Sequence, residues 1–344
     1  MTSPESVSGS SPANRQPSTA NRVAIIGAGP IGLELAVSLK QHGIEYLQFD
    51  AGQVGSTMQW YPLQMLFHSS AERLAIAGVP IQVADQQKPN REEFLAYLRG
   101  VVQQFALEVK TFERVVNVHR TEGRFTLKTV AVDGPHVYHV DEIVLAIGAM
   151  HEPKLLGIPG EELPHVSHYF HDPHTYFGKR LLIVGGRNSA IEAAVRCQRA
   201  GAQVTLSHRG EDFDPASVKF WLLPEIRSMI RDQRVRHLPR TAPVEIRGGT
   251  VLLDTGDEIA ADFVLALTGY RQDTTLFERL GVDLQGADRK PALDESTMET
   301  NVPGVFVAGT AIAGSPQKRV QVIVEDCHVH VPRIVSAIRR RHGH

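Results

Sequence analysis

The chain has 344 residues, which is enough for two domains that each bury a core. Hydrophobic residues make up 42% and charged residues 22%, as in an ordinary soluble globular protein, and the net charge of −2 argues against nucleic acid or an anionic membrane surface as a partner. Only two cysteines occur, which excludes a disulfide framework and favours the cytoplasm, and no apolar run is long enough to cross a membrane.

Residues 1–21 are rich in Ser, Pro, Thr and Ala and contain no apolar run. This composition predicts a disordered tail and argues against a secretory signal. The ordered chain is then expected to begin with a strand at Val23–Ile26, a helix at Leu33–Leu39 and a second strand at Tyr46–Phe49.

The first predicted strand runs directly into a glycine-rich turn. A buried strand that turns through glycine into a helix presents backbone N–H groups to a pyrophosphate, so the pattern predicts a dinucleotide site. Asp50, at the end of the second strand, can accept both hydroxyls of an adenosine ribose and repels a 2′-phosphate, which suits FAD or NAD and not NADP. The residues expected at this site are Gly27, Gly29, Pro30, Ile31, Gly32 and Asp50.

The next segment is predicted to be a loop from Gln53 to Phe67, in which Tyr61 either lies beside a flavin or covers the core. A helix is expected at Arg91–Phe105, followed by strands at Val115–His119 and Arg124–Val130 that alternate as in a meander. The run Glu142–Gly148 predicts a strand that ends in glycine. It resembles the segment by which disulfide-reductase-type flavoproteins leave their first FAD-binding stretch, which implies that Gly148 faces FAD.

A second glycine-rich turn follows the apolar run Leu181–Val184. A helix from Ala190 to Arg199 and a strand from Val204 to Leu206 complete the same pattern, and His208-Arg209 stands at the position equivalent to Asp50. A cationic pair there can neutralise a 2′-phosphate, which predicts NADPH. Arg187 replaces the second glycine and is expected to pair with the pyrophosphate. The site is expected to contain Gly185, Arg187, Asn188, Ser189, Ala190, His208 and Arg209.

The remaining segments predict an α/β fold with two Rossmann-like, three-layer (ββα/βα) nucleotide-binding domains, the NADPH domain being inserted in a discontinuous FAD domain. The chain leaves the FAD domain (22–153), forms the NADPH domain (154–272) and returns for the second FAD part (273–344). The return strand leads to Gly309 and Thr310, and a helix is expected from about Val320. In flavoproteins with a similar layout, an aspartate that contacts the ribityl chain usually follows this glycine, and Thr310 stands in its place.

Two flavoprotein families resemble this arrangement. The order of the two glycine motifs is similar to low-molecular-weight thioredoxin reductases. A closer resemblance is to the bacillithiol-disulfide reductase family, carried by separate stretches at Phe67–Leu74, Val166–Phe170, Gly185–Ala190, Val218–Pro224 and Ile323–Asp326. The resemblance implies an NADPH-dependent FAD oxidoreductase of the pyridine nucleotide-disulfide type, with Ser69 and Ser70 toward the flavin and Lys219 supporting NADPH.

The chain departs from both families in its thiols. Thioredoxin reductases carry a Cys-x-x-Cys where this chain has His168 and His171, and the closer family commonly has cysteine where this chain has Ile31. Cys197, on a predicted buried helix face, and Cys327, beside two acidic residues, are poor nucleophiles. We therefore consider His168 or His171 as a proton donor to a reduced substrate, because imidazole titrates near neutral pH.

The sequence thus favours transfer of electrons from NADPH through FAD to a small acceptor, most simply a low-molecular-weight disulfide. Three alternatives stay open: a flavin monooxygenase, a ferredoxin or flavodoxin reductase, and a flavin-bearing redox sensor without turnover. No metal is expected, because the histidines of 165–174 are interrupted by prolines and lack acidic or thiol partners. We also expect a homo-oligomer.

Overall fold

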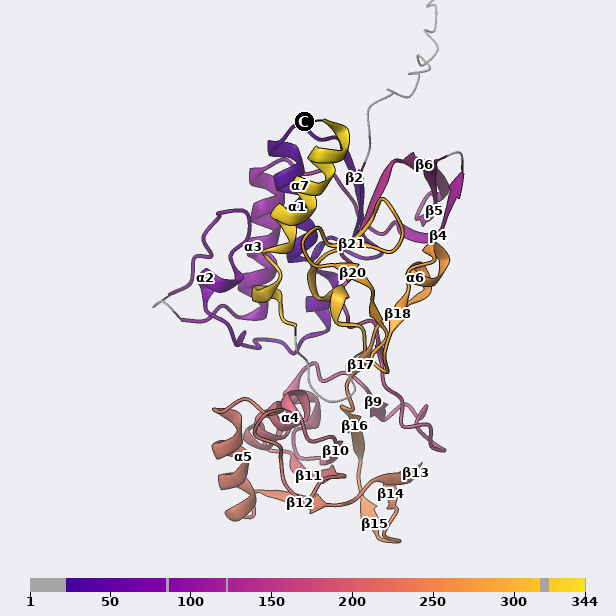
Figure 1. The fold of residues 1–344 in the computed structure, drawn as a ribbon. Coiled ribbons are helices and arrows are strands. Elements are labelled where there is room, and N and C mark those ends of the chain that lie inside the picture. The colour runs from indigo at the N-terminus through magenta and orange to yellow at the C-terminus, as the bar shows by residue number, and fades with distance from the viewer. Residues whose placement is uncertain (1–22, 85–86, 122, 316–321, 344) are drawn as a thin grey trace, which may run out of the picture.

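The computed structural model describes residues 23–84, 87–121, 123–315 and 322–343. The tail predicted at residues 1–21 lies outside these ranges. Two lobes, each built on a mainly parallel sheet, lie at opposite ends of the molecule (Figure 1). None of the described helices is long and apolar enough to span a bilayer.

The first lobe contains a seven-stranded sheet in the order β20-β21-β22-β7-β1-β2-β3. Its central strands are parallel, because β1 pairs in this sense with both β2 and β7. The strands are β1 (Val23–Ile26), β2 (Tyr46–Phe49), β3 (Val109–Lys110), β7 (Glu142–Leu145), β20 (Leu293–Asp294), β21 (Glu299–Thr300) and β22 (Val305–Val307).

Alternation along β1 explains the three layers of this lobe. Val23 and Ile25 pack in the core formed with the helices, whereas Ala24 and Ile26 pack in the core formed with a second, antiparallel sheet. The helices are α1 (Pro30–Gln41), α3 (Arg91–Gln104) and α7 (His330–His342), and the antiparallel strands are β4 (Arg114–Thr121), β5 (Arg124–Ala131) and β6 (Gly134–Val140).

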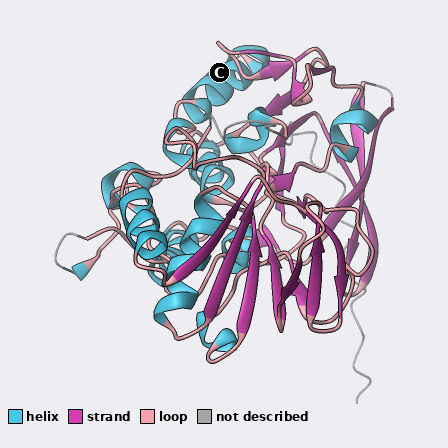
Figure 2. Ribbon diagram, turned by 90° about the horizontal axis from the view of Figure 1, so that it is seen from below, coloured by secondary structure: helices cyan, strands magenta, loops and turns pink. Residues whose placement is uncertain are grey.

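The second lobe repeats this layering around a five-stranded parallel sheet, β12-β11-β10-β16-β9. Its strands are β9 (Val166–Ser167), β10 (Arg180–Val184), β11 (Gln203–His208), β12 (Val235–Pro239) and β16 (Phe263–Ala266). One face carries α4 (Asn188–Arg199) and α5 (Leu222–Arg231), and the other carries β13 (Pro243–Arg247), β14 (Thr250–Leu253) and β15 (Glu258–Ala260). Figure 2 shows these strands side by side, with helices to one side.

Two short strands join the lobes. β8 (Glu152–Pro153) leads into the second lobe and β17 (Tyr270–Arg271) leads out of it, and the two pair antiparallel. The second lobe is therefore an insertion in the first, as the sequence predicts. The chain continues through α6 (Thr275–Leu280) and the hairpin β18 (Leu284–Gln285) and β19 (Lys290–Pro291).

The short helical segments are η1 (Ser56–Trp60), α2 (Ala71–Leu74), η3 (Pro173–Tyr176), η4 (Gly309–Ala313) and η5 (Val324–Asp326). The start predicted for the last helix, at about Val320, is wrong, since α7 begins at His330, after η5. The sequence also missed β6, the third strand of the predicted meander.

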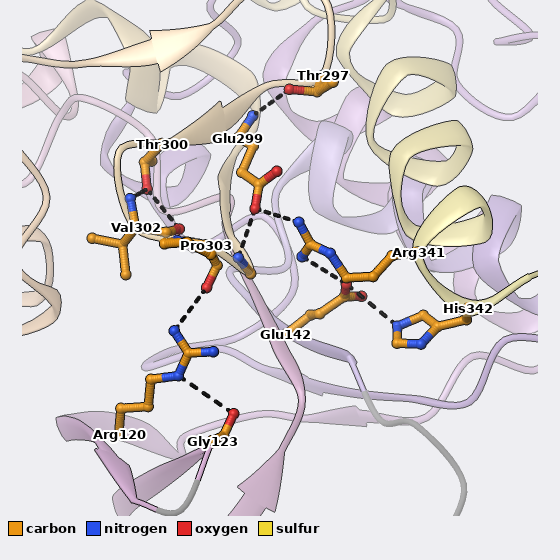
Figure 3. A network of polar contacts seen from close by, with 11 residues as sticks. Arg120, Gly123, Glu142, Thr297, Glu299, Thr300, Val302, Pro303, Arg341 and His342 are labelled. Atoms are coloured by element: carbon orange, nitrogen blue, oxygen red, sulfur yellow. Dashed lines mark hydrogen bonds and ion pairs between the residues drawn. The ribbon is translucent and has the colours of Figure 1, made fainter.

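The C-terminal helix is held against two strands of the first sheet by a charged network (Figure 3). Arg341 lies between Glu142 of β7, at 3.0 Å, and Glu299 of β21, at 2.5 Å. The Glu142 side chain is only 2% exposed, and His342 contacts the same carboxylate at 3.4 Å. A buried carboxylate of this kind needs its cationic partners, so the network holds α7 in place.

Candidate active site

The first glycine turn is closed on two sides and open on the third. Gly27 has a φ of +119°, and a Cβ there would lie 2.3 Å from the carbonyl oxygen of Ala146. A Cβ on Gly32 would lie 2.3 Å from the carbonyl oxygen of Gly27, whereas a Cβ on Gly29 would meet nothing within 4 Å. The turn thus packs tightly against β7 and its own helix and leaves room at Gly29, as a pyrophosphate requires.

The helix that follows is prepared for an anion. α1 begins with Pro30, and no side chain caps its N-terminus. Its first N–H groups are therefore available to a phosphate oxygen. Ile31 is 4% exposed and packs beneath Gly309, where an added Cβ would lie 3.4 Å from the Ile31 Cβ.

Asp50 is held against this turn at the carboxyl end of β2. Its Oδ2 accepts a hydrogen bond from the Ala28 N–H at 2.7 Å, and its Oδ1 accepts bonds from Gly52 N–H at 2.8 Å and Ser56 Oγ at 3.1 Å. Gln48, two residues earlier, donates to the Gly27 carbonyl oxygen at 3.0 Å. Sequence reasoning missed Gln48 as a residue of this site. The signal that could have found it is an amide side chain in an otherwise apolar strand.

Gly148 and Thr310 come together from two strands of the first sheet. A Cβ on Gly148 would lie 3.7 Å from Thr310 Oγ1. Gln272, which directly follows β17, donates from Nε2 to the carbonyl oxygens of Gly148 and Ala311, both at 2.9 Å. Sequence reasoning missed Gln272, because nothing local marks it as part of this site.

The buried amide of Gln272 provides a test of whether FAD fits here. Its side chain belongs to a residue that is 5% exposed, and its Oε1 has no hydrogen-bond partner among the described residues. A buried unpaired carbonyl costs about 1–3 kcal/mol. The ribityl hydroxyls and the flavin N3–H of FAD are donors that would satisfy it, so the residues present fit the cofactor.

The loop before α2 contains the remaining residues predicted on the flavin side. Burial raises the pKa of the Tyr61 phenol, and the ring lies 6.1 Å from that of Phe67. Ser70 is the N-cap residue of α2, and Ser69 precedes it. Contacts from Ser69 and Ser70 to a flavin remain predictions.

The second glycine turn follows the same design with one difference. Gly185 has a φ of +144°, and a Cβ there would lie 2.6 Å from the Leu267 carbonyl oxygen and 2.9 Å from the Ala190 Cβ. A small residue is therefore needed at Ala190. Arg187 is the exposed N-cap residue of α4 and provides no side-chain cap.

The polar residues of the first turn of α4 have different surroundings. Asn188 Oδ1 accepts a bond from the Lys219 backbone N–H at 2.8 Å, which ties the 217–221 loop to the turn. Ser189 is exposed. This backbone bond places Lys219 beside the predicted nucleotide site.

The surroundings of His208 bear on the positive charge predicted there. A Cβ on Gly186 would lie 2.1 Å from His208 Cδ2, and the ring stacks on Phe213 with centroids 5.4 Å apart. Burial, followed by the nearby charge of Arg209, lowers the pKa of His208. The neutral imidazole is therefore favoured at neutral pH, and the exposed Arg209 supplies the charge of this pair.

The two lobes meet along a seam that includes His171. Leu63 N–H donates to the His171 carbonyl oxygen at 2.9 Å, and the Arg196 guanidinium donates to the Leu63 carbonyl oxygen at 2.5 Å. The Tyr169 ring lies between those of Trp60, at 5.6 Å, and Tyr270, at 6.0 Å. The bond from Leu63 brings the backbone of His171, one of the two predicted proton donors, beside the loop that contains Tyr61.

His168, the other predicted donor, has a different neighbour. Its Nε2 lies 3.5 Å from Glu161 Oε1 in the segment that enters the second lobe. The same carboxylate accepts bonds from Leu156 N–H at 2.5 Å and Gly157 N–H at 2.7 Å. The structure therefore separates the environments of His168 and His171.

Neither cysteine is suited to nucleophilic chemistry. Cys197 and Cys327 are both free and fully buried, and burial raises the pKa of each thiol to about 12. Thiolate, the reactive form, is scarce at neutral pH for such groups. Within the described ranges, no three His, Cys, Asp or Glu side chains are grouped as a metal ion would require.

Comparisons with known proteins agree with this geometry. The family model for "Pyridine nucleotide-disulphide oxidoreductase" matches residues 24–309. Bacilliredoxin reductase Bdr of Bacillus subtilis is 35% identical over 328 residues, which cover 94% of this chain and 99% of that protein. A ferredoxin–NADP reductase of Ignicoccus hospitalis is 30% identical over 298 residues, which cover 83% of this chain and 88% of that protein.

A solved structure extends the similarity to three dimensions. Bacillithiol disulfide reductase Bdr (YpdA) from Bacillus cereus superposes with a TM-score of 0.89 at 34% identity, covering 94% of this chain and 100% of that one. The resemblance expected from the sequence is thereby confirmed. The chain belongs to the pyridine nucleotide-disulphide oxidoreductase family and, within it, to the bacillithiol disulfide reductase flavoproteins, whose cofactors are FAD and NADPH.

Proposed function

We propose that this enzyme reduces a low-molecular-weight disulfide with electrons from NADPH. The observation that carries the proposal is the pair of glycine turns in one chain, the first beside the Asp50 carboxylate and the second beside the Arg209 guanidinium. A carboxylate suits an unphosphorylated ribose and a guanidinium suits a 2′-phosphate. The class of acceptor is supported by the relatives named for reduction of bacillithiol disulfide and bacilliredoxin.

The net reaction consumes one proton in addition to the hydride of NADPH: NADPH, a proton and a disulfide give NADP⁺ and two thiols. When bound, FAD would provide the chemistry that accepts the hydride and passes on two electrons. We propose that Gly27, Gly29, Gly32 and Asp50 hold its pyrophosphate and ribose. Gly148, Thr310 and Gln272 then position the ribityl side.

The second turn is proposed to orient NADPH. Gly185 and the first turn of α4, from Asn188 to Ala190, direct N–H groups to the diphosphate. Arg187 contributes a guanidinium at the same helix end, and Arg209 pairs with the 2′-phosphate while His208 packs beneath the turn. Lys219 stays beside this site through its bond to Asn188.

His171 is proposed to deliver the proton to the departing thiolate. The bond from Leu63 N–H to its carbonyl oxygen places the backbone of His171 at the seam, and its side chain is exposed, which supports this role over one for His168, whose Nε2 lies 3.5 Å from Glu161. The net reaction takes up a proton, and neither buried cysteine is available to carry the substrate as a mixed disulfide. The proton must reach a sulfur atom from an imidazole or from water.

A second candidate function is reduction of ferredoxin. A ferredoxin–NADP reductase is among the relatives, and the lack of a reactive thiol is compatible with transfer of single electrons. The experiment that decides is to reduce the FAD-loaded enzyme anaerobically with NADPH and to follow flavin absorbance after adding, in parallel, bacillithiol disulfide, glutathione disulfide, ferredoxin or oxygen.

Fast reoxidation by a disulfide alone supports the proposal. Fast reoxidation by ferredoxin alone transfers the assignment to the second candidate, and a long-lived oxygen adduct indicates a monooxygenase. Failure of every acceptor favours a redox sensor.

We further propose that the enzyme is a cytoplasmic homo-oligomer with domains at 22–153, 154–272 and 273–344. Both cysteines are free, which suits a reducing compartment. Light scattering coupled to size exclusion tests the oligomeric state. Limited proteolysis tests the domain boundaries.

A further inference from the structure

An aromatic contact joins the segment beside the second glycine turn to the opposite lobe. The centroid of the Trp221 ring lies 5.1 Å from that of the His68 ring, and the Lys88 ammonium lies over the indole, 4.5 Å from its centroid. Trp221 belongs to the second lobe, whereas His68 and Lys88 belong to the first. The indole therefore packs on an imidazole and on a cation of the other lobe.

The segment that carries Trp221 is firmly held in its own lobe. Val218 is 3% exposed and packs in the core of that lobe, and the Lys219 N–H donates to Asn188 Oδ1 at 2.8 Å. α5 begins directly after Trp221, and the Leu222 N–H donates to the Lys219 carbonyl oxygen at 3.0 Å. Because Asn188 is the first residue of α4, at the second glycine turn, the position of Trp221 is tied to the proposed NADPH site.

On the first lobe, the contact ends on the loop that is expected to face FAD. Phe67, which precedes His68, donates its N–H to the Pro89 carbonyl oxygen at 2.9 Å. Its ring lies 4.7 Å from that of the fully buried Phe94 on α3. Ser69, which the family resemblance places toward the flavin, directly follows His68. The contact thus runs from the second glycine turn to the proposed flavin loop.

The chemistry of the three side chains suits a fixed packing contact. Burial lowers the pKa of His68 to about 4, and the positive charges of Lys219 and Lys88 add to this effect. The imidazole is therefore neutral at neutral pH and packs on the indole as an aromatic ring. The Lys88 ammonium adds a cation–π contact to the same indole.

We propose that Trp221 is a positioning residue that holds the NADPH-binding lobe against the flavin loop for hydride transfer. This inference rests on the proposed function, in which NADPH reduces bound FAD. Trp221 acts together with the bond from Arg196 to Leu63, which reaches the same loop of the first lobe. A hydride donor and its acceptor must lie about 3–3.5 Å apart, so a small relative shift of the lobes slows the step.

The test combines a rate and an affinity, both measured on the FAD-loaded enzyme. The rate is the limiting rate of flavin reduction by NADPH in anaerobic stopped-flow experiments, and the affinity is the dissociation constant of NADP⁺ by calorimetry. Trp221→Leu should lower the rate about tenfold, because a displacement of about 1 Å can cost a hundredfold. The dissociation constant should change by less than about twofold, since the bond from Lys219 to Asn188 is kept. Trp221→Phe keeps an aromatic ring and should retain most of the rate.

Three further variants and a second readout localise the effect. Phe220→Leu is the matched control and should reduce flavin at the wild-type rate, because Phe220 is 81% exposed beside Trp221. Lys88→Met should lower the rate about threefold, the factor that an exposed cation–π contact is worth. The double variant Lys88→Met/Trp221→Leu should be no slower than Trp221→Leu, since both substitutions remove one contact. Hydrogen exchange at the Phe67 amide, which needs no turnover, should quicken in Trp221→Leu and not in Phe220→Leu.

The outcomes separate this proposal from the proposed function. A rate for Trp221→Leu within about twofold of the wild type, or a faster one, would overturn the positioning role and leave the proposed function intact. A tenfold rise in the dissociation constant of NADP⁺ would overturn it as well, because Trp221 would then bind the nucleotide itself.

Reduction of the wild-type flavin by NADH alone would overturn NADPH use, and Trp221 would then be judged with NADH. Failure of both nucleotides to reduce the flavin would overturn the proposed function and this role with it. If Trp221→Leu does not retain FAD, Lys88→Met decides, and an unchanged rate in that variant overturns the proposal.

Discussion

The Arg196 guanidinium on α4 donates a hydrogen bond to the carbonyl oxygen of Leu63, in the loop of the opposite lobe, at 2.5 Å. Arg196 also lies 3.3 Å from Glu192 and over the Phe170 ring, 5.3 Å from its centroid. One side chain therefore joins the helix of the second glycine turn to the loop that contains Tyr61. This contact is one of those that hold the two nucleotide sites in their relative position, together with the bond from Leu63 N–H to the His171 carbonyl oxygen.

Replacing Arg196 by Met should loosen the seam between the lobes. The variant loses a charge-assisted hydrogen bond, worth about 1.5–3 kcal/mol, and leaves the largely buried Glu192 without its partner. We expect faster hydrogen exchange at the Leu63 amide and a melting temperature a few degrees lower. Arg199→Met is the control, because Arg199 is exposed on the same helix and pairs with Glu225 within its own lobe. Equal exchange in the two variants would contradict the prediction.

A cysteine-free enzyme should keep its disulfide reductase activity. Cys197 and Cys327 are buried, their thiol pKa values are raised to about 12, and Ile31 occupies the position of the cysteine common in the family. The Cys197→Ala/Cys327→Ala variant should therefore turn over within about twofold of the wild type once its FAD content is matched. Mass spectrometry should detect no mixed disulfide on the wild type. A tenfold loss in the variant, with a mixed disulfide on the wild type, would instead assign the chemistry to a thiol.

Arg209→Gln should change the choice of nucleotide. Since burial disfavours the charged form of His208, Arg209 is the cation that distinguishes a 2′-phosphate from a hydroxyl. Its removal should raise KM for NADPH about tenfold or more and leave KM for NADH nearly unchanged. Arg236→Gln, an exposed residue on β12 of the same lobe, is the control. An unchanged ratio of the two KM values would show that selectivity lies elsewhere.

Gln272→Met should weaken FAD binding. The variant keeps the volume of the side chain but loses both donors to Gly148 and Ala311 and the buried Oε1 that FAD is proposed to satisfy. We expect the dissociation constant of FAD, measured by recovery of flavin fluorescence, to rise about tenfold. Gln285→Met on the exposed side of β18 should not change it. Retention of FAD by Gln272→Met at wild-type affinity would remove Gln272 from the site.

Features set by neighbouring residues in the chain could be predicted from the sequence, whereas contacts between distant segments could not. Both glycine turns and the order of the lobes are local or repeated patterns, because a buried strand, a turn and a helix within about 30 residues specify one another. Gln272 and the contact of Arg196 with Leu63 join segments far apart in the chain, and no local pattern contains them. The burial of the His208 ring against Gly186 and Phe213, which disfavours its charged form, could not be predicted for the same reason, since it exists only in the folded protein.

His330 should make the enzyme sensitive to acid. It is 4% exposed, its Nδ1 accepts a hydrogen bond from Gly309 N–H at 3.2 Å, and burial, with the charges of Arg333 and His328, lowers its pKa to about 4. Protonation would remove the acceptor beside Thr310. Between the ordinary histidine pKa of 6.5 and about 4, the unfolded chain binds more protons at this residue than the folded chain. The free energy of unfolding should therefore fall as the pH drops through this window, and FAD should be released with it.

His330→Asn retains an acceptor for Gly309 and does not titrate, so its melting temperature should depend less on pH between 6.5 and 4 than that of the wild type. His328 is the matched control with the opposite sign, because its hydrogen bond to Glu34 at 2.7 Å raises its pKa. Its contribution is present at low pH and lost as the pH rises through the raised pKa. His328→Gln should thus reduce the loss of stability on the alkaline side and, because it removes the smallest of the three causes that lower the pKa of His330, should reduce the acid slope much less than His330→Asn does. An acid slope that persists in His330→Asn would place the titrating group elsewhere.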